Sequence, residues 1–375
     1  MLTKIKKTAY TVLIKERLVA YMPFLFTPRI KASENAFFAA MNTPIGFRSC
    51  FTSLFSPHRQ YIIKGGPGTG KSTLMKSLAA KAEANGLSVE RYFCSSDSTS
   101  LDAVLIPSLS TVLLDGTSPH ATEPTLFGVK DRYLDLSRFL DTDRLPECEL
   151  LATLAKRKKE AYQTAYRALS ALDATDRILA PYRESAFDRD KCKKTLTRLI
   201  ERLGLSGEKS PQKIEKPISA LSCEGYVTLD SRAKHARLTV KIQDRFGVAP
   251  LVFKILTVLL DEKRVSYFES LSPLTLSPDT LYLPQGKILI SALPFTDDPA
   301  VTINCERFLA GRGQGLYKGK KALLTAEEAL FSTACTALSE AASIHHESEG
   351  YYSAAMDFNA MNAYAEALLD EILTK

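Results

Sequence analysis

The chain lacks the cysteine and apolar patterns that mark several classes of protein. Its seven cysteines are dispersed and form no C-x-x-C pair, which argues against a disulfide framework or a zinc knuckle and fits a reducing cytosol. No apolar run approaches the roughly 20 residues that a helix needs to span a bilayer. No A-x-A-like cleavage site follows a clean apolar segment, so we expect no secretory signal. These absences predict a cytoplasmic protein without a transmembrane segment.

The composition fits a globular protein of more than one domain. Of 375 residues, 45% are hydrophobic and 24% are charged, which excludes a mostly disordered, a collagen-like or a multi-span membrane protein. The length exceeds what one ordinary core uses, so we expect two domains.

The net charge of +7 is unevenly distributed. Residues 151–216 hold 16 basic and 9 acidic side chains, whereas the tail from Ala322 holds nine acidic side chains and only one basic side chain, Lys375. These surfaces are either solvated or docked on each other or on a charged partner. The basic segment contains no aromatic–basic recognition motif, which disfavours nucleic acid without excluding it.

A nucleotide-binding motif follows a short apolar run, Tyr61-Ile62-Ile63, that suits a buried strand. The next segment matches G-x-x-x-x-G-K-[ST], and residues 73–84 then have the apolar spacing of a helix. Strand, glycine-rich turn and helix form the context in which this pattern binds phosphate. The residues expected to bind the nucleotide are Gly65, Gly66, Pro67, Gly68, Thr69, Gly70, Lys71, Ser72 and Thr73.

The chemistry of this segment follows from its residue types. Glycines let successive N–H groups turn toward phosphate oxygens, and the helix N-terminus adds partial positive charge. Lys71 is expected to reach the β- and γ-phosphates as a catalytic group, and the hydroxyl of Ser72 to bind Mg²⁺. No guanine-specific motif stands out, so the nucleotide is ATP or GTP.

A second metal-side residue is predicted at Asp115, which ends the apolar run Thr111–Leu114 in the manner of a Walker B strand. The alternative is an aspartate that begins a turn before Gly116. Because Gly116 occupies the position where many motor ATPases carry a water-activating glutamate, fast autonomous hydrolysis is not expected.

Two further side chains are candidates for catalysis. Asp97 follows a predicted parallel strand, residues 89–94, and is a candidate base or substrate contact; the alternative is a helix N-cap. Asp102 is a weaker candidate, because Ser100-Leu101-Asp102 resembles a helix start. His120 follows the Walker B strand and is predicted to sense the γ-phosphate or carry a proton, unless it is a structural turn residue.

Several of these segments resemble a family of poorly characterised bacterial P-loop ATPases, in which two P-loop domains stand in tandem. The likeness covers about residues 36–120 and implies nucleotide binding, but no physiological substrate. The segments that carry it are Ile63 to Leu74, Cys94 to Asp97, Ser100 to Asp102 and Leu114 to His120, preceded by Asn42-Thr43 and Gly46-Phe47.

The sequence repeats weakly within itself, as a tandem protein should. A shift of 177 places Gly70 beside Gly247, and a shift of 169 places Arg138-Phe139-Leu140 beside Arg307-Phe308-Leu309. In the second copy, Val248, Ala249 and Ala292 replace the phosphate lysine, the magnesium serine and the metal aspartate, and Ile242 and Arg245 replace loop glycines. We therefore expect a degenerate second domain that binds no nucleotide, whether it is a true copy or an unrelated α/β domain.

The predicted fold is α/β: two P-loop NTPase-like, doubly wound parallel-sheet domains with helical appendages. We expect a basic extension at 1–33, an active domain at 34–205 whose appendage begins near 145, a linker at 206–217 and a degenerate domain at 218–375. The helical segments are expected to be interrupted at Pro181-Tyr182.

The expected function is an ATP-binding P-loop NTPase with slow or partner-stimulated hydrolysis. One alternative is a small-molecule kinase that transfers the γ-phosphoryl group to a substrate near Asp97 and His120. A second alternative is a nucleotide-sensing interaction module. The expected partners are a nucleoside triphosphate, Mg²⁺ and either a protein or a small-molecule substrate.

Overall fold

A computed structural model describes residues 29–30, 35–295 and 299–374 of the chain. The extension predicted at 1–33 therefore lies outside the described residues except for Arg29–Ile30 (β1). The chain forms two compact units. Within the described residues, the P-loop unit comprises 29–167, 216–231 and 334–374, and the second unit comprises 168–215 and 232–333.

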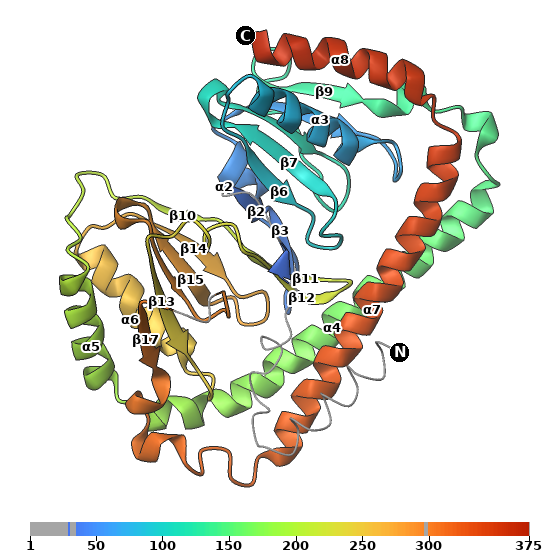
Figure 1. Ribbon diagram of the computed structural model, residues 1–375. Coiled ribbons are helices and arrows are strands. Elements are labelled where there is room, and N and C mark those ends of the chain that lie inside the picture. The colour runs from blue at the N-terminus through green and yellow to red at the C-terminus, as the bar shows by residue number, and fades with distance from the viewer. Residues whose placement is uncertain (1–28, 31–34, 296–298, 375) are drawn as a thin grey trace. The chain divides into compact units, whose positions relative to one another are not determined.

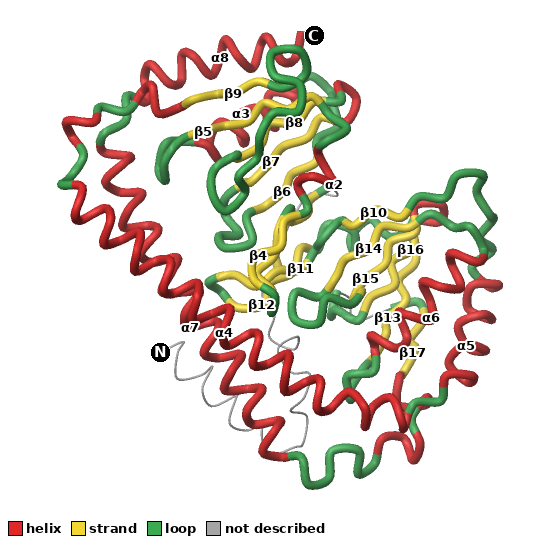
Figure 2. Tube along the Cα trace, turned by 180° about the vertical axis from the view of Figure 1, so that it is seen from behind, coloured by secondary structure: helices red, strands yellow, loops and turns green. Residues whose placement is uncertain are grey.

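The P-loop unit is built on a six-stranded sheet of order β2-β6-β7-β8-β5-β9, seen from behind in Figure 2. β5 lies between β8 and β9 and runs parallel to both. β7 runs antiparallel to both neighbours, because the connection Cys94–Ser100 is shorter than the dozen residues that a parallel crossover needs. The strands are β2 (Ala36–Phe38), β5 (Arg59–Lys64), β6 (Glu90–Phe93), β7 (Leu101–Ile106), β8 (Thr111–Asp115) and β9 (Arg132–Asp135).

The second unit has a six-stranded sheet with the same plan, in the order β10-β14-β15-β16-β13-β17. β15 is its antiparallel strand, and the register shift between Ser270 and Leu271 matches the one between Tyr92 and Phe93. The predicted α/β class in two domains is thus confirmed, with mixed sheets. The strands are β10 (Lys213–Glu215), β13 (Leu238–Gln243), β14 (Tyr267–Leu271), β15 (Pro278–Leu283), β16 (Ile288–Ser291) and β17 (Val301–Asn304).

Smaller elements complete the two units. The hairpins β3–β4 and β11–β12 belong to the P-loop unit, where β1 pairs with β12. Their bounds are β3 (Ala40–Thr43), β4 (Gly46–Ser49), β11 (Ser219–Ser222) and β12 (Gly225–Leu229). The short helices are α2 (Phe51–Phe55), η3 (Pro107–Leu109), η4 (Leu136–Phe139), η5 (Thr142–Arg144), η6 (Pro284–Gly286), η7 (Cys305–Phe308) and η8 (Ala310–Gly313).

The long helices are divided between the two units in a way that the domain boundaries predicted from the sequence do not follow. The bounds are α3 (Lys71–Ala84), α4 (Cys148–Ala186), α5 (Arg189–Arg202), α6 (Ala249–Glu262), α7 (Lys321–Ala354) and α8 (Phe358–Thr374). α5 follows the first sheet in sequence but packs on α6 in the core of the second unit, whereas α8 packs on α3 in the P-loop unit. Figure 1 shows α8, in red, beside β9 and α3. Each repeat therefore supplies its helical appendage to the unit that contains the other repeat's sheet.

Backbone contacts show how each appendage is attached. In the P-loop unit, the N–H of Asp357 donates to the carbonyl of Phe139 at 2.8 Å. In the second unit, the N–H of Asp188 donates to the carbonyl of Phe308 at 2.7 Å. The two donors are 169 residues apart in sequence, and so are the two acceptors. In each contact the donor comes from one repeat and the acceptor from the other, so the same docking geometry occurs twice.

Two local predictions are wrong, and a third segment has structure that the sequence did not suggest. α4 continues through Pro181 and ends at Ala186, so the proline removes one helical hydrogen bond without ending the helix. Asp188 then caps α5 by accepting the N–H of Lys191. Ser100–Asp102 begins no helix, because Leu101 opens strand β7. The linker predicted at 206–217 contains strand β10. Among the described residues, no helix has both the length and the apolar character needed to cross a bilayer.

Candidate nucleotide site

The P-loop lies between β5 and α3 and has the backbone that the motif predicts. Gly68 and Gly70 have φ values of 68° and 85°, a left-handed region that glycine adopts without strain. Gly70 is the N-cap of α3, so the free N–H groups of the first helical turn begin at Lys71. Thr69 closes the turn by donating its hydroxyl to the carbonyl of Gly66 at 2.9 Å. The turn is thereby held in the shape of an anion-binding nest.

Lys71 and Asp115 lie together at the end of the sheet. The ammonium of Lys71 donates to the carbonyls of Gly65 and Gly66 at 3.1 and 2.7 Å and lies 3.7 Å from Oδ2 of Asp115. Asp115 is held in turn by the N–H and the hydroxyl of Thr117, which donate to Oδ1 at 2.8 and 2.6 Å. Because β5 and β8 are adjacent and parallel, the two motifs meet at one edge of the sheet.

Ser72 and Asp115 supply the donor set expected for magnesium. The hydroxyl oxygen of Ser72 accepts the N–H of Leu101 at 3.0 Å, which leaves a lone pair for a metal. Mg²⁺ prefers oxygen ligands and keeps several waters, so one hydroxyl, one carboxylate and phosphate oxygens suffice. No cluster of three or more histidine, cysteine or acidic side chains that could hold a metal by itself occurs in the described part of the chain.

Asp97 holds the turn between β6 and β7. Its carboxylate accepts the N–H and the hydroxyl of Thr99 at 3.0 and 2.8 Å and the hydroxyl of Ser100 at 2.6 Å. Burial raises the pKa of Asp97, but these hydrogen bonds more than offset burial and lower the pKa below its usual value. The carboxylate is thus a poor proton acceptor and a good turn-former.

His120 is buried and paired with Asp102, a residue that sequence reasoning placed on a helix. Its Nε2 lies 3.2 Å from Oδ2 of Asp102, and its ring stacks on Phe51 and meets Phe47 edge-on. Burial lowers the pKa of His120, but the negative charges of Asp102 and Asp115 raise it by more, so that the pKa lies above 6.5. The sequence feature that could have indicated a buried partner for His120 is the single charged residue, Asp102, in the otherwise apolar strand β7.

The end of α7 covers the P-loop, which sequence reasoning did not predict. The hydroxyl of Ser353 donates to the carbonyl of Gly68 at 3.0 Å. A Cβ added to Gly66 would lie 2.9 Å from the ring of Tyr352, and one added to Gly68 would meet the carbonyl oxygen of Glu349. The loop glycines therefore allow this close contact with the helix, besides the phosphate binding that the motif predicts.

A basic side chain from α4 lies near this contact. The ammonium of Lys158 lies 3.4 Å from Nδ1 of His345, whose Nε2 lies 3.4 Å from Glu349. Burial lowers the pKa of Lys158; the charge of Glu349 raises it, and that of Lys71 lowers it further. Lys158 and Lys71 are thus close enough for the charge of one to affect the pKa of the other.

The turn between β13 and α6 is the counterpart of the P-loop, but it is shorter than the 177-residue shift between the two repeats implied. Lys64 pairs with Asp135, and Gln243 pairs with Asn304, so Gln243 is the structural counterpart of Lys64. Ile242, which we aligned with a loop glycine, is a buried residue of β13. Five residues, 65–69, precede Gly70, and three, 244–246, precede Gly247.

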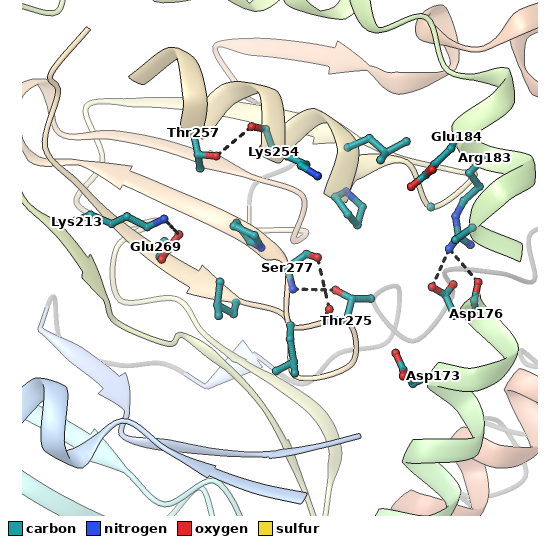
Figure 3. A pocket seen from close by; sticks show the side chains of 17 residues that line it. Asp173, Asp176, Arg183, Glu184, Lys213, Lys254, Thr257, Glu269, Thr275 and Ser277 are labelled. Carbon is teal, nitrogen blue, oxygen red and sulfur yellow. Dashed lines mark hydrogen bonds and ion pairs between the residues drawn. The ribbon is translucent and has the colours of Figure 1, made fainter. Parts of the chain in front are cut away.

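Next to this turn the second unit contains a cavity of about 530 Å³ (Figure 3). Its walls include Gly247 and Pro250 from the turn and the first helical residues of α6. Many charges on its walls pair with each other: Lys213 lies 3.4 Å from Glu269, and Arg183 lies 2.7 Å from Asp176. These pairs give the cavity little of the unpaired positive charge that a triphosphate needs.

Comparison with known proteins gives one match. Residues 47–200 match the family model described as nephrocystin 3, N-terminal. The match covers less than half of the chain and includes the P-loop, α3 and Asp115. No curated protein and no solved structure matches the chain. The similarity therefore concerns the first half of the chain.

Proposed function

We propose that the P-loop unit binds Mg²⁺ with ATP or GTP and that the chain is a slow or partner-stimulated NTPase, related to tandem P-loop ATPases. The observation that supports this most is the approach of Lys71 to Asp115 beside a turn with two left-handed glycines, with the hydroxyl of Ser72 on the first turn of α3. When the triphosphate binds, the ammonium of Lys71 exchanges its two carbonyl partners for phosphate oxygens. The N–H groups of the turn hold the phosphates in place.

Slow hydrolysis is the form of the proposal that the neighbouring side chains favour. Hydrolysis needs a group that orients the attacking water. Gly116 follows Asp115, the carboxylate of Asp97 is engaged by its own turn, and His120 is buried against Asp102. A partner that supplies the missing group fits this arrangement, and the dispersed cysteines fit a cytoplasmic setting.

Kinase activity is the weaker candidate, because the carboxylate of Asp97 would have to give up three hydrogen bonds before it could accept a proton from a substrate. A nucleotide-sensing module is favoured by the contact of α7 with the P-loop, because α7 also runs through the second unit. Nucleotide-dependent movement of the loop would act directly on this helix.

Labelled nucleotide separates these functions. Purified protein with Mg²⁺ and γ-labelled ATP should release phosphate at roughly 10⁻⁴–10⁻² s⁻¹, the range between P-loop switches that lack an arginine finger and those that carry one in their own chain. Label that appears only in a metabolite would indicate a kinase, and tight binding without turnover would indicate a sensor. Absence of binding to both ATP and GTP would refute the proposal.

A further inference from the structure

In the second unit, the turn that corresponds to the P-loop is occupied by a side chain of its own. Asp244 directly follows β13, as Gly65 follows β5. Its Oδ1 accepts the N–H groups of Phe246 and Gly247, both at 3.0 Å, and its Oδ2 accepts the N–H of Ala249 at 2.6 Å. One carboxylate thus takes up three N–H groups at the start of α6.

These N–H groups are the counterparts of phosphate-binding groups in the first turn. Gly247 has a φ of 76° and Gly70 a φ of 85°; Gly70 directly precedes α3, and Gly247 is separated from α6 by one residue, Val248. With these glycines aligned, Phe246 corresponds to Thr69 and Ala249 to Ser72. In a P-loop the N–H groups at these positions converge on phosphate oxygens. The carboxylate therefore occupies the place of a phosphate group.

The length of the turn explains how Asp244 reaches this place. With two fewer residues than the P-loop, the turn brings the first residue after the strand close to the start of the helix. Burial raises the pKa of Asp244, while the N–H groups of the turn lower it. The backbone donors thus offset part of the desolvation of the carboxylate.

We propose that Asp244 is a built-in anion that closes this turn to phosphate, and that removing the carboxylate opens a binding site for inorganic phosphate or diphosphate. On this proposal, the filled nest would keep nucleotide out of the second unit more directly than the missing lysine would.

The turn has supports other than Asp244, which makes the test feasible. The hydroxyl of Tyr317 donates to the carbonyl of Phe246, and a Cβ on Gly313 would lie 2.8 Å from the Phe246 ring. These contacts hold the far side of the turn and should preserve its fold when the carboxylate is removed.

The experiment uses the full chain with Lys71→Ala as the parent, so that the first site does not respond. Asp244→Ala in this parent should melt at lower temperature, and inorganic phosphate or diphosphate should raise its Tm by about 3 °C or more over sodium chloride of equal ionic strength. The parent itself should show no such rise. Asn304→Ala is the matched control, because it removes a side chain that caps only one N–H, that of Glu306 at 2.9 Å.

The proposal is overturned if Asp244→Ala responds to phosphate no more than Asn304→Ala or the parent. Asp244→Asn provides a second reading if the alanine variant does not fold. It should be less stable than the parent, because an amide nitrogen cannot accept the N–H of Ala249. Equal stability of Asp244→Asn and the parent would also overturn the proposal.

Discussion

Ser353, the second-last residue of α7, donates its hydroxyl to the carbonyl of Gly68 in the P-loop at 3.0 Å. The two residues are 285 positions apart in sequence. The candidate nucleotide-binding loop of the first repeat is thus covered by a helix of the second repeat, and a change in the loop must be accommodated by that helix.

Gly68→Ala should destabilise the P-loop unit beyond the cost of its left-handed backbone. A left-handed non-glycine residue costs about 1–2 kcal/mol, and the new Cβ would also meet the carbonyl oxygen of Glu349. Gly86→Ala is the control, because Gly86 has a φ of 74° and nothing within 4 Å of an added Cβ. Chemical denaturation should show a larger loss for Gly68→Ala; equal losses would mean that α7 does not cover the loop in solution.

Lys71→Ala should abolish the rise in Tm that Mg·ATP or Mg·GTP produces. The variant removes the ammonium that lies 3.7 Å from Asp115 and is expected to bind the β- and γ-phosphates. Val248→Ala changes the counterpart residue in the second unit and should retain the nucleotide-dependent rise, measured against its own nucleotide-free Tm. An undiminished rise in Lys71→Ala would place the nucleotide elsewhere.

The His120–Asp102 pair should make stability fall as pH rises. Because the folded-state pKa of His120 is raised above 6.5, its stabilising contribution is fully present below pH 6.5 and is lost as pH rises through the folded pKa. Asp102→Asn should reverse this slope, because burial then lowers the pKa of His120, and should cost about 1–3 kcal/mol at low pH, the penalty for a buried polar group that has lost its partner.

The measurement is the free energy of unfolding between pH 5.5 and 8.5 in both proteins. Burial lowers the pKa of His58, which gives the opposite slope, but this contribution is common to both. The difference between wild type and Asp102→Asn therefore isolates the pair. A difference that does not shrink with rising pH would contradict the assignment.

Leu369→Ala should weaken the nucleotide site although it lies at the far end of the sequence. Leu369 of α8 is 1% exposed in the core that also contains Leu74 and Leu78 of α3. Removing it should cost about 2–5 kcal/mol. Leu196→Ala of α5, 0% exposed in the other core, is the matched control.

Limited proteolysis with and without Mg·ATP is the measurement for this pair of variants. Nucleotide should protect the P-loop unit less well in Leu369→Ala than in Leu196→Ala. The reverse result would restore the boundaries predicted from sequence, in which α5 supports the first sheet.

The candidate site was predictable where its chemistry is contiguous. The residues Gly65 to Ser72 form one turn, and their spacing imposes the backbone whatever surrounds it, so the strand, loop and helix were predicted to within one or two residues of their observed ends. Asp115 was predictable because an aspartate that ends an apolar strand stands out locally. The α/β class followed from the same local patterns.

The tertiary structure decided everything that depends on distant contacts. Which sheet α5 or α8 covers cannot be read from an apolar stripe, because the same stripe fits either sheet. The pairing of Asp102 with His120, the contact of Ser353 with Gly68 and the carboxylate of Asp244 in its turn all arise from chain path and turn length. Local sequence thus determined which elements form and the backbone of the P-loop, whereas packing determined which side chains surround it, since burial and proximity are properties of the folded chain.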